Sequence, residues 1–110
     1  MRAEKRRQLE RAGWAVGDAS EFLDLSAEER RFIEVKLALA EGVRQRRERL
    51  GLTQSALAER LGSSQSRVAK MEAAHRSVST DLLLRSLFSL GARPADVARL
   101  LTTKARVDAA

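Results

Sequence analysis

The segment 53–72 constrains the fold of this chain more than any other, because its sequence, TQSALAERLGSSQSRVAKME, predicts two short helices joined by a tight turn at Gly62. Thr53 and Ser64 are suited to cap the two helices, since each hydroxyl can accept a hydrogen bond from a free backbone N–H. Helices that cross steeply over a short turn need a small residue where they meet, and Ala58 supplies it. The segment is therefore predicted to be a helix-turn-helix.

The apolar spacing of these two helices predicts which of their sides face each other. Gly62 permits the positive φ that the turn requires. The residues expected to lock the pair from the inside are Leu57, Leu61, Val68 and Met71. The polar side chains then left on or beside the outward face of the second helix are Gln65, Ser66, Arg67 and Lys70.

This outward face carries the side-chain types that read bases in the DNA major groove. Gln presents a donor and an acceptor together to adenine, Ser is a short adaptable donor, and Arg or Lys prefers guanine. A helix exposed only to solvent more commonly carries Glu/Lys pairs, since serine is a mediocre helix former. We expect phosphate contacts from the residues at helix N-termini and in the following basic loop. These are Thr53, Gln54, Ser64, Arg76, Ser77 and Ser79.

The charge distribution agrees with a nucleic-acid partner. The net charge is +6, and residues 41–79 carry eight basic and four acidic side chains. Residues 1–11 carry five basic and two acidic side chains, whereas residues 12–40 carry three basic and six acidic ones. Basic surface supplies the sequence-independent, salt-sensitive part of nucleic-acid affinity. The positive charge thus coincides with the helix-turn-helix and with the extreme N-terminus.

Outside this segment the chain also has the composition of helices, with one Pro, six Gly and 44% apolar residues. Residues 27–50 predict one long helix or two that abut at Gly42, with Phe32, Val35, Leu39 and Val43 on one face. Ser79 is placed to cap a helix that ends before Gly91, and Pro94 to begin the last one. No segment alternates with the period of a strand, so the fold class is all-α.

Several functions are disfavoured. The chain has no Cys and one His, so we expect no disulfide, no metal site and no cofactor, and an enzyme is improbable. There is no apolar run of 18 residues and no signal-peptide core, so a cytoplasmic protein without membrane contact is expected.

Residues 43–90 resemble the Cro/phage-repressor type helix-turn-helix family, often called XRE, over about half of the chain. The motifs that carry the resemblance are Leu-Thr-Gln, Leu-Ala, Leu-Gly, Gln-Ser-x-Val and a closing Glu72. The resemblance implies base contacts by Gln65, Ser66 and Lys70, and a phosphate contact by Gln54. It also implies a partly buried, bidentate ion pair between Arg47 and Glu72.

Two positions depart from the family pattern. A Gly commonly follows the closing Glu by two residues, but here that residue is Ala74, so the loop after the recognition helix is expected to turn differently. Ser63 is often apolar in the family, which weakens the packing of the turn. Neither change touches the base-reading face.

Together these features predict a five-helix, repressor-like helix-turn-helix domain over residues 33–102. A short helical N-terminal extension or arm is expected over residues 1–32, and a frayed C-terminal tail over residues 103–110. The extension resembles that of small HigA-like antitoxins. An apolar stripe of Leu84 and Phe88 suits the symmetric interface of a homodimer.

Three hypotheses for the function remain. The first is a homodimeric, sequence-specific transcriptional regulator, a repressor, that inserts the helix Ser64–Ala73 into the major groove of double-stranded DNA at an inverted-repeat operator. The second is an antitoxin that binds its own promoter and neutralises a small toxin protein through residues 1–32. The third is a protein-interaction module that no longer reads DNA, which the intact outward face argues against.

Overall fold

The structure is a computed structural model that describes residue 7 and residues 26–109, with side chains described as far as Thr102. Every regular element in this part of the chain is a helix, which confirms the all-α fold with its helix-turn-helix. The helices are α3 (Ala27–Arg49), α4 (Gln54–Leu61), α5 (Gln65–Glu72), α6 (Thr80–Ser89) and α7 (Pro94–Ala109). Most of the expected N-terminal extension lies outside the described residues.

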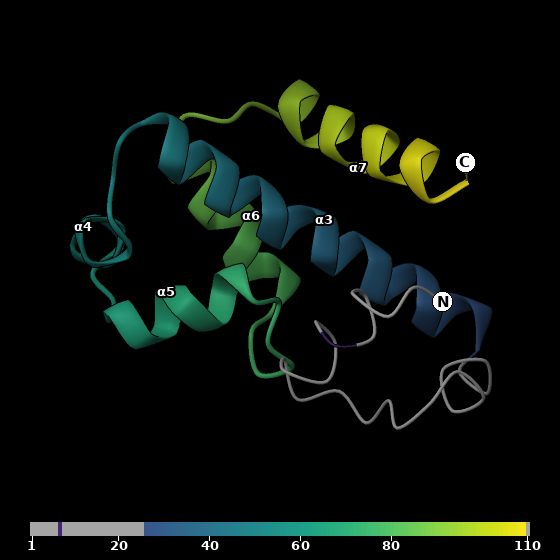
Figure 1. Cartoon of the computed structure of the whole chain (residues 1–110), viewed down its shortest axis with the longest axis horizontal. Coiled ribbons are helices and arrows are strands. Elements are labelled where there is room, and N and C mark those ends of the chain that lie inside the picture. The colour runs from purple at the N-terminus through teal and green to yellow at the C-terminus, as the bar shows by residue number, and fades with distance from the viewer. Residues whose placement is uncertain (1–6, 8–25, 110) are drawn as a thin grey trace.

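Helix α3 is the central element of the fold. In Figure 1 it runs the length of the molecule, with α7 along one side and α5 and α6 on the other. The Ser26 hydroxyl caps it by accepting a hydrogen bond from the Glu29 backbone N–H at 3.1 Å. Gly42 lies inside this single helix, and a Cβ at Gly42 would overlap the Leu100 side chain of α7. The glycine therefore allows the close approach of α7 and does not divide α3.

The buried face of α3 differs from the one that the apolar spacing predicted. Leu39 and Val43 are buried, but Phe32 and Val35 are 49% and 37% exposed. Ile33, with Leu37 and Ala40 from the same helix, takes the inward position instead. Apolar residues surround this part of the helix almost completely, so periodicity alone does not distinguish the face that the other helices cover.

The core joins α3 to the helix-turn-helix and to α6. Its largest fully buried side chains include Leu39, Leu57, Met71, Leu83, Leu87, Val43 and Val68. Leu61, Leu100 and Leu101 pack against this core while partly exposed. Among the described residues, none of the helices is long and apolar enough to cross a membrane.

Two of the expected domain boundaries fall inside helices. The division between residues 32 and 33 lies within α3, which starts at Ala27. Residues 103–109, expected to fray, continue the backbone of α7. The helix that contains residues 32 and 33 is continuous from the Ser26 cap to Arg49.

Helices α4 and α5 form the helix-turn-helix itself. In Figure 1, α4 is seen end-on while α5 lies across the view, so the two axes cross steeply. Gly62 ends α4 with φ 65° and ψ 38°, the left-handed conformation that glycine adopts at low cost. The Ser63 N–H then donates to the Ala58 carbonyl at 2.8 Å, and Ala58 is buried where the helices meet.

Candidate nucleic-acid interface

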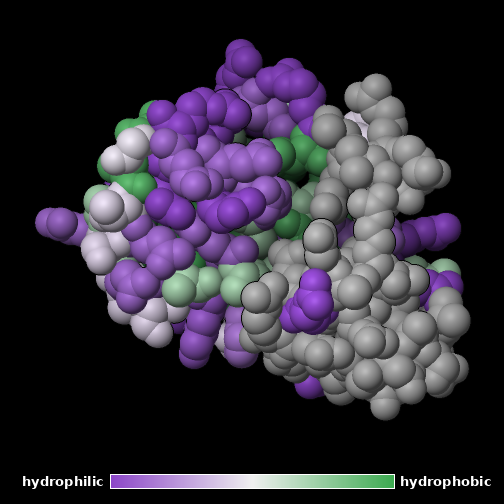
Figure 2. All heavy atoms as spheres, viewed as in Figure 1, coloured by the Kyte–Doolittle hydropathy of each residue, from purple (hydrophilic) through white to green (hydrophobic). Residues whose placement is uncertain are grey.

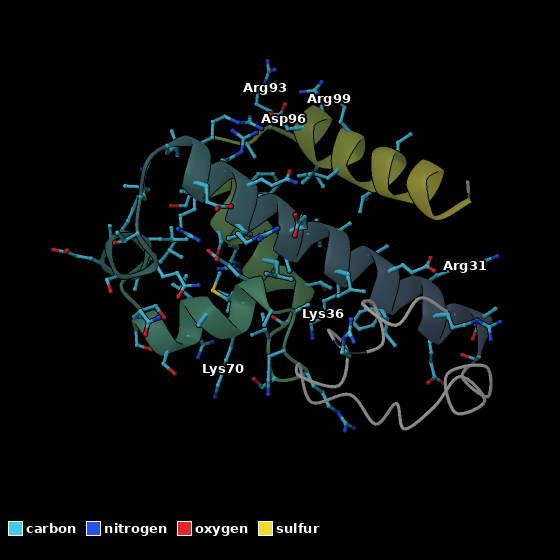
Figure 3. All side chains as sticks on the ribbon, in the orientation of Figure 1. Arg31, Lys36, Lys70, Arg93, Asp96 and Arg99 are labelled. Atoms are coloured by element: carbon cyan, nitrogen blue, oxygen red, sulfur yellow. The ribbon has the colours of Figure 1, made fainter. Side chains whose placement is uncertain are left out.

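The outward face of α5 is polar and open to solvent. Val68 and Met71 are fully buried on its inner side. The side chains exposed on its outer side are Gln65, Ser66, Arg67 and Lys70. In Figure 3 the Lys70 side chain points away from α3, out of the fold. Figure 2 shows that the described part of this view of the molecule is mainly hydrophilic.

A shallow pocket joins this face to the loop that precedes α6. Its volume is about 290 Å³, and it is lined by Ser64, Ser66, Arg67, Lys70, Ser77 and Val78. The pocket thus places side chains assigned to bases beside side chains assigned to phosphates. Hydroxyl groups with two cationic side chains make a lining suited to an anionic backbone.

Three hydroxyl groups cap the helices around this face. Thr53 accepts from the Ala56 N–H at 3.0 Å, Ser64 from the Arg67 N–H at 3.1 Å, and Ser79 from the Leu82 N–H at 3.1 Å. In each bond the hydroxyl oxygen is the acceptor, so its hydrogen is still available to donate. A phosphodiester only accepts hydrogen bonds. Capping a helix and contacting a phosphate are therefore compatible at these residues.

The loop after α5 turns as it would with glycine, although it carries alanine. Ala74 has φ 55° and is buried, while the His75 N–H donates to the Lys70 carbonyl at 2.9 Å. This is the glycine-type end of a helix, and the other helix ends with positive φ in the described residues use glycine. The expectation that this loop turns differently is therefore wrong. Alanine adopts the same conformation as glycine would, but at the cost of backbone strain.

The same loop is fastened by two side chains. His75 Nδ1 lies 2.8 Å from the Ser77 hydroxyl and accepts a hydrogen bond from the Ser77 N–H at 3.1 Å. From α3, the Lys36 ammonium donates to the Arg76 carbonyl at 3.3 Å. Lys36 is 3% exposed, and this burial lowers its pKa. The role of Lys36 was not predicted, although a charged residue inside the apolar run of α3 was a signal for it.

An ion pair joins the end of α3 to the end of α5. Arg47 Nε donates to Glu72 Oε2 at 2.6 Å, and Arg47 Nη2 donates to Oε1 at 3.0 Å. Their side chains are 13% and 5% exposed. Arg47 Nη1 also donates to the Leu52 carbonyl at 2.8 Å, and the hydrogen bond to Glu72 raises the pKa of Arg47. The structure thus holds these two residues in the bidentate, partly buried pair that the resemblance implied.

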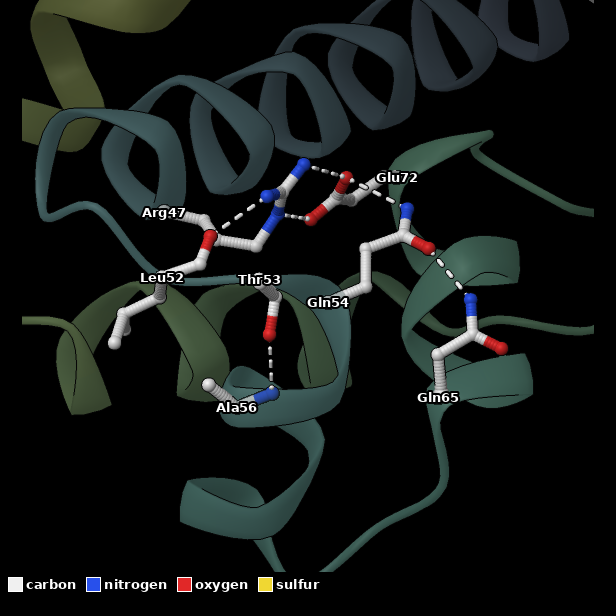
Figure 4. Close-up of polar contacts among 7 residues, drawn as sticks. All are labelled: Arg47, Leu52, Thr53, Gln54, Ala56, Gln65 and Glu72. Atoms are coloured by element: carbon white, nitrogen blue, oxygen red, sulfur yellow. Dashed lines mark hydrogen bonds and ion pairs between the residues drawn. The ribbon is translucent and has the colours of Figure 1, made fainter.

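Two glutamines continue from this ion pair to the surface (Figure 4). Gln54 Nε2, at the start of α4, donates to Glu72 Oε1 at 3.1 Å. Gln65 Nε2, at the start of α5, donates to Gln54 Oε1 at 2.7 Å. Gln54 is expected to contact a phosphate and Gln65 a base, and the contact between the two side chains was not predicted from the sequence.

A second charged cluster lies where α7 meets α3, and Figure 3 shows it on the side of α3 opposite Lys70. Asp96 accepts from the Arg93 N–H at 2.8 Å and pairs with Arg99 and, at 3.7 Å, with Arg46 of α3. The hydrogen bond from the Arg93 backbone, together with these arginines, lowers the pKa of Asp96. Through the contact between Arg46 and Asp96, the cluster links α7 to α3.

Comparison with known proteins places the helix-turn-helix in a family. The model of the helix-turn-helix family matches residues 43–85, from the last third of α3 to the middle of α6. No curated protein and no solved structure shows a significant match to the chain. The matched segment contains α4, α5 and the ion pair that closes the motif. Residues 43–85 therefore form a helix-turn-helix DNA-binding motif of the Cro/phage-repressor (XRE) type.

Proposed function

We propose that this DNA-binding regulator is a sequence-specific repressor that binds an inverted-repeat operator as a homodimer, with α5 in the major groove. The observation that carries the proposal is the exposed face of α5, which is flanked by the N-termini of α4 and α6 and by a basic loop. In this arrangement the residues that read bases are Gln65, Ser66, Arg67 and Lys70. Those that hold phosphates are Thr53, Gln54, Ser64, Arg76, Ser77 and Ser79.

The exposed apolar residues support the homodimer. Phe88 on α6 is 46% exposed, and Leu84 lies on the same helix, partly buried against the core. Two copies related by a two-fold axis through this part of α6 would cover Phe88 and present two recognition helices to two half-sites. The Phe88→Ala variant should then be monomeric in analytical ultracentrifugation, whereas the wild-type chain is dimeric.

Selection of bound duplexes from a random pool, at a stated salt concentration, tests the base-reading assignment. The wild-type chain should enrich one sequence. On that duplex, Gln65→Ala should weaken binding at one base pair of each half-site and relax the preference there.

Arg76→Ala is the matched control for a phosphate contact. It should weaken specific and random duplexes alike and reduce the slope of log affinity against log salt by about one. Equal losses on both kinds of duplex for Gln65→Ala and Arg76→Ala would contradict the assignment of α5 to base reading.

The alternative function is that of an antitoxin, and one observation favours it. Phe32, at the end of the segment assigned to a toxin partner, is 49% exposed on α3. A toxin partner would cover this side chain. The alternative predicts that a toxin encoded beside this chain binds it and that Phe32→Asp abolishes the complex but not DNA binding. A Phe32→Asp variant that still binds both the toxin and DNA would remove this support.

A further inference from the structure

Four side chains form one continuous path from the inside of the domain to the base-reading face. It runs from Arg47 to Glu72, then to Gln54 and finally to Gln65, with donor–acceptor distances of 2.6 to 3.1 Å. Glu72 is almost fully buried, Gln54 is half-buried and Gln65 is exposed. Figure 4 shows the path crossing from α3 through the start of α4 to the start of α5.

The chemistry of the buried end fixes the direction of every hydrogen bond in this path. Glu72 is a carboxylate paired with an arginine, so it only accepts. Gln54 must therefore turn its amide nitrogen toward Glu72, which leaves its carbonyl oxygen toward Gln65. Gln65 in turn must donate its nitrogen to that oxygen. The carbonyl oxygen of Gln65 is left free, together with its second N–H.

We infer that Glu72 is a positioning residue for sequence recognition: acting through Gln54, it sets the amide orientation of Gln65 and so selects the base that Gln65 reads. The inference rests on the proposed function, because it requires that Gln65 contacts a base edge.

The orientation set in this way matches adenine. In the major groove adenine offers an acceptor at N7 and a donor at N6, and it is read by an amide that donates and accepts side by side. Gln65 keeps one N–H for N7 and its carbonyl oxygen for N6. Gln54 also keeps a second N–H, which remains available for the phosphate assigned to it. A bidentate contact of this kind corresponds to a preference of roughly 5- to 150-fold over the wrong base.

Glu72→Gln replaces the end of the path that only accepts with an amide that can turn either way. With its oxygen at the Oε1 position the new side chain still accepts from Arg47 Nη2 and from Gln54, and the path is unchanged. With its oxygen at the Oε2 position it accepts from Arg47 Nε and its nitrogen donates to Gln54, which reverses the path. Gln65 would then present either a donor and an acceptor or two donors to the groove, so its preference for adenine over guanine should fall.

Gln54→Met breaks the path at its middle and leaves the ion pair of Arg47 and Glu72 in place. Gln65 would then have no fixed orientation, and its preference for adenine should fall to within about threefold of the other bases. This variant keeps the buried charges paired, so it tests the inference even if Glu72→Gln does not fold.

The experiment measures affinity for four duplexes that carry each base pair in turn at the position where Gln65→Ala relaxes the preference. We expect a preference for adenine in the wild-type chain, a smaller preference for adenine over guanine in Glu72→Gln, and a preference within about threefold in Gln54→Met. A purely structural role for Glu72 would weaken all four duplexes equally and leave the ratios of their affinities unchanged. Unchanged ratios in both variants would overturn the inference.

Failure of the proposed function looks different. If the wild-type chain enriches no sequence from the random pool, the repressor proposal fails and this inference fails with it. If enrichment occurs and the ratios of the four affinities stay the same in both variants, only the inference fails.

Discussion

The two sides of α3 each carry a carboxylate bound by arginine, and the two carboxylates differ in what they hold. Glu72 is 5% exposed and pairs with an arginine that is 13% exposed. Asp96 is 14% exposed, but of its partners only Arg46 is largely buried, at 24% exposed, whereas Arg93 and Arg99 are 76% and 66% exposed. The first carboxylate is connected through Gln54 to the exposed face of α5, whereas the second holds α7 beside α3. The Arg47–Glu72 pair is expected to be the more costly one to break, because both of its members are buried while two of the three arginines around Asp96 stay in solvent.

The largest expected effect comes from removing one partner of the buried pair. Arg47→Met leaves the Glu72 carboxylate buried beside Gln54 without its cation. The free energy of unfolding should fall by about 3–5 kcal/mol. Urea denaturation followed by circular dichroism measures it.

Arg44→Met is the matched control for that change. Arg44 lies one turn of α3 away and pairs with Glu41 at the surface, with side chains 47% and 35% exposed. A surface pair of this kind contributes about 0–1 kcal/mol. A loss of equal size in Arg44→Met and Arg47→Met would contradict the distinction between buried and surface pairs.

The two sides also differ in the residue that adopts a positive φ at a helix end, which is Gly91 after α6 and Ala74 after α5. Exchanging alanine and glycine at these positions should change the free energy of unfolding by an intermediate amount. Gly91, before α7, has φ 91°, and a Cβ added there would meet no atom within 4 Å, so Gly91→Ala tests backbone strain alone. It should lower the free energy of unfolding by about 1–2 kcal/mol.

Ala74→Gly is the reverse change, on the α5 side of the molecule. It should raise the free energy of unfolding by less than about 1 kcal/mol, because relief of strain at φ 55° is partly offset by loss of a buried methyl group. Thermal unfolding of both variants checks the signs. A loss of stability in Ala74→Gly would show that the alanine methyl, and not the backbone, decides this position.

The smallest effect concerns pH on the α7 side. The pKa of Asp96 is lowered in the folded chain, so its ionised form stabilises the fold above the ordinary pKa of 3.8. This contribution is lost as pH falls through the folded-state pKa. Asp96→Asn should therefore unfold at a lower temperature than the wild-type chain at pH 7, with the difference vanishing in acid. A difference that is constant with pH would contradict the role of the charge.

Local sequence patterns predicted most of the helix-turn-helix. The features that they did not predict depend on how the helices pack against one another. The caps at Thr53, Ser64 and Ser79 depend on neighbouring residues, so the sequence was enough to place them. The contact between Gln54 and Gln65, eleven residues apart, depends on how two helices cross. No periodicity contains that information.

Two further differences have the same origin. Lys36 is polar by type, but it is buried because α3 is covered on both sides, and its partner lies forty residues away. Ala74 adopts a positive φ because the loop that it begins is anchored at both ends. In both cases the surrounding packing outweighs the preference of the residue itself.

The most direct test of the central claim, that the α5 side of the molecule binds DNA and the α7 side does not, is a titration of the ¹⁵N-labelled chain with its selected duplex. The largest amide shifts are predicted at the starts of α4, α5 and α6 and in the loop 75–78, with Asp96 and its neighbours unchanged. Shifts centred on Asp96 and α7, with the amides of Gln65 and Lys70 unmoved, would contradict the account.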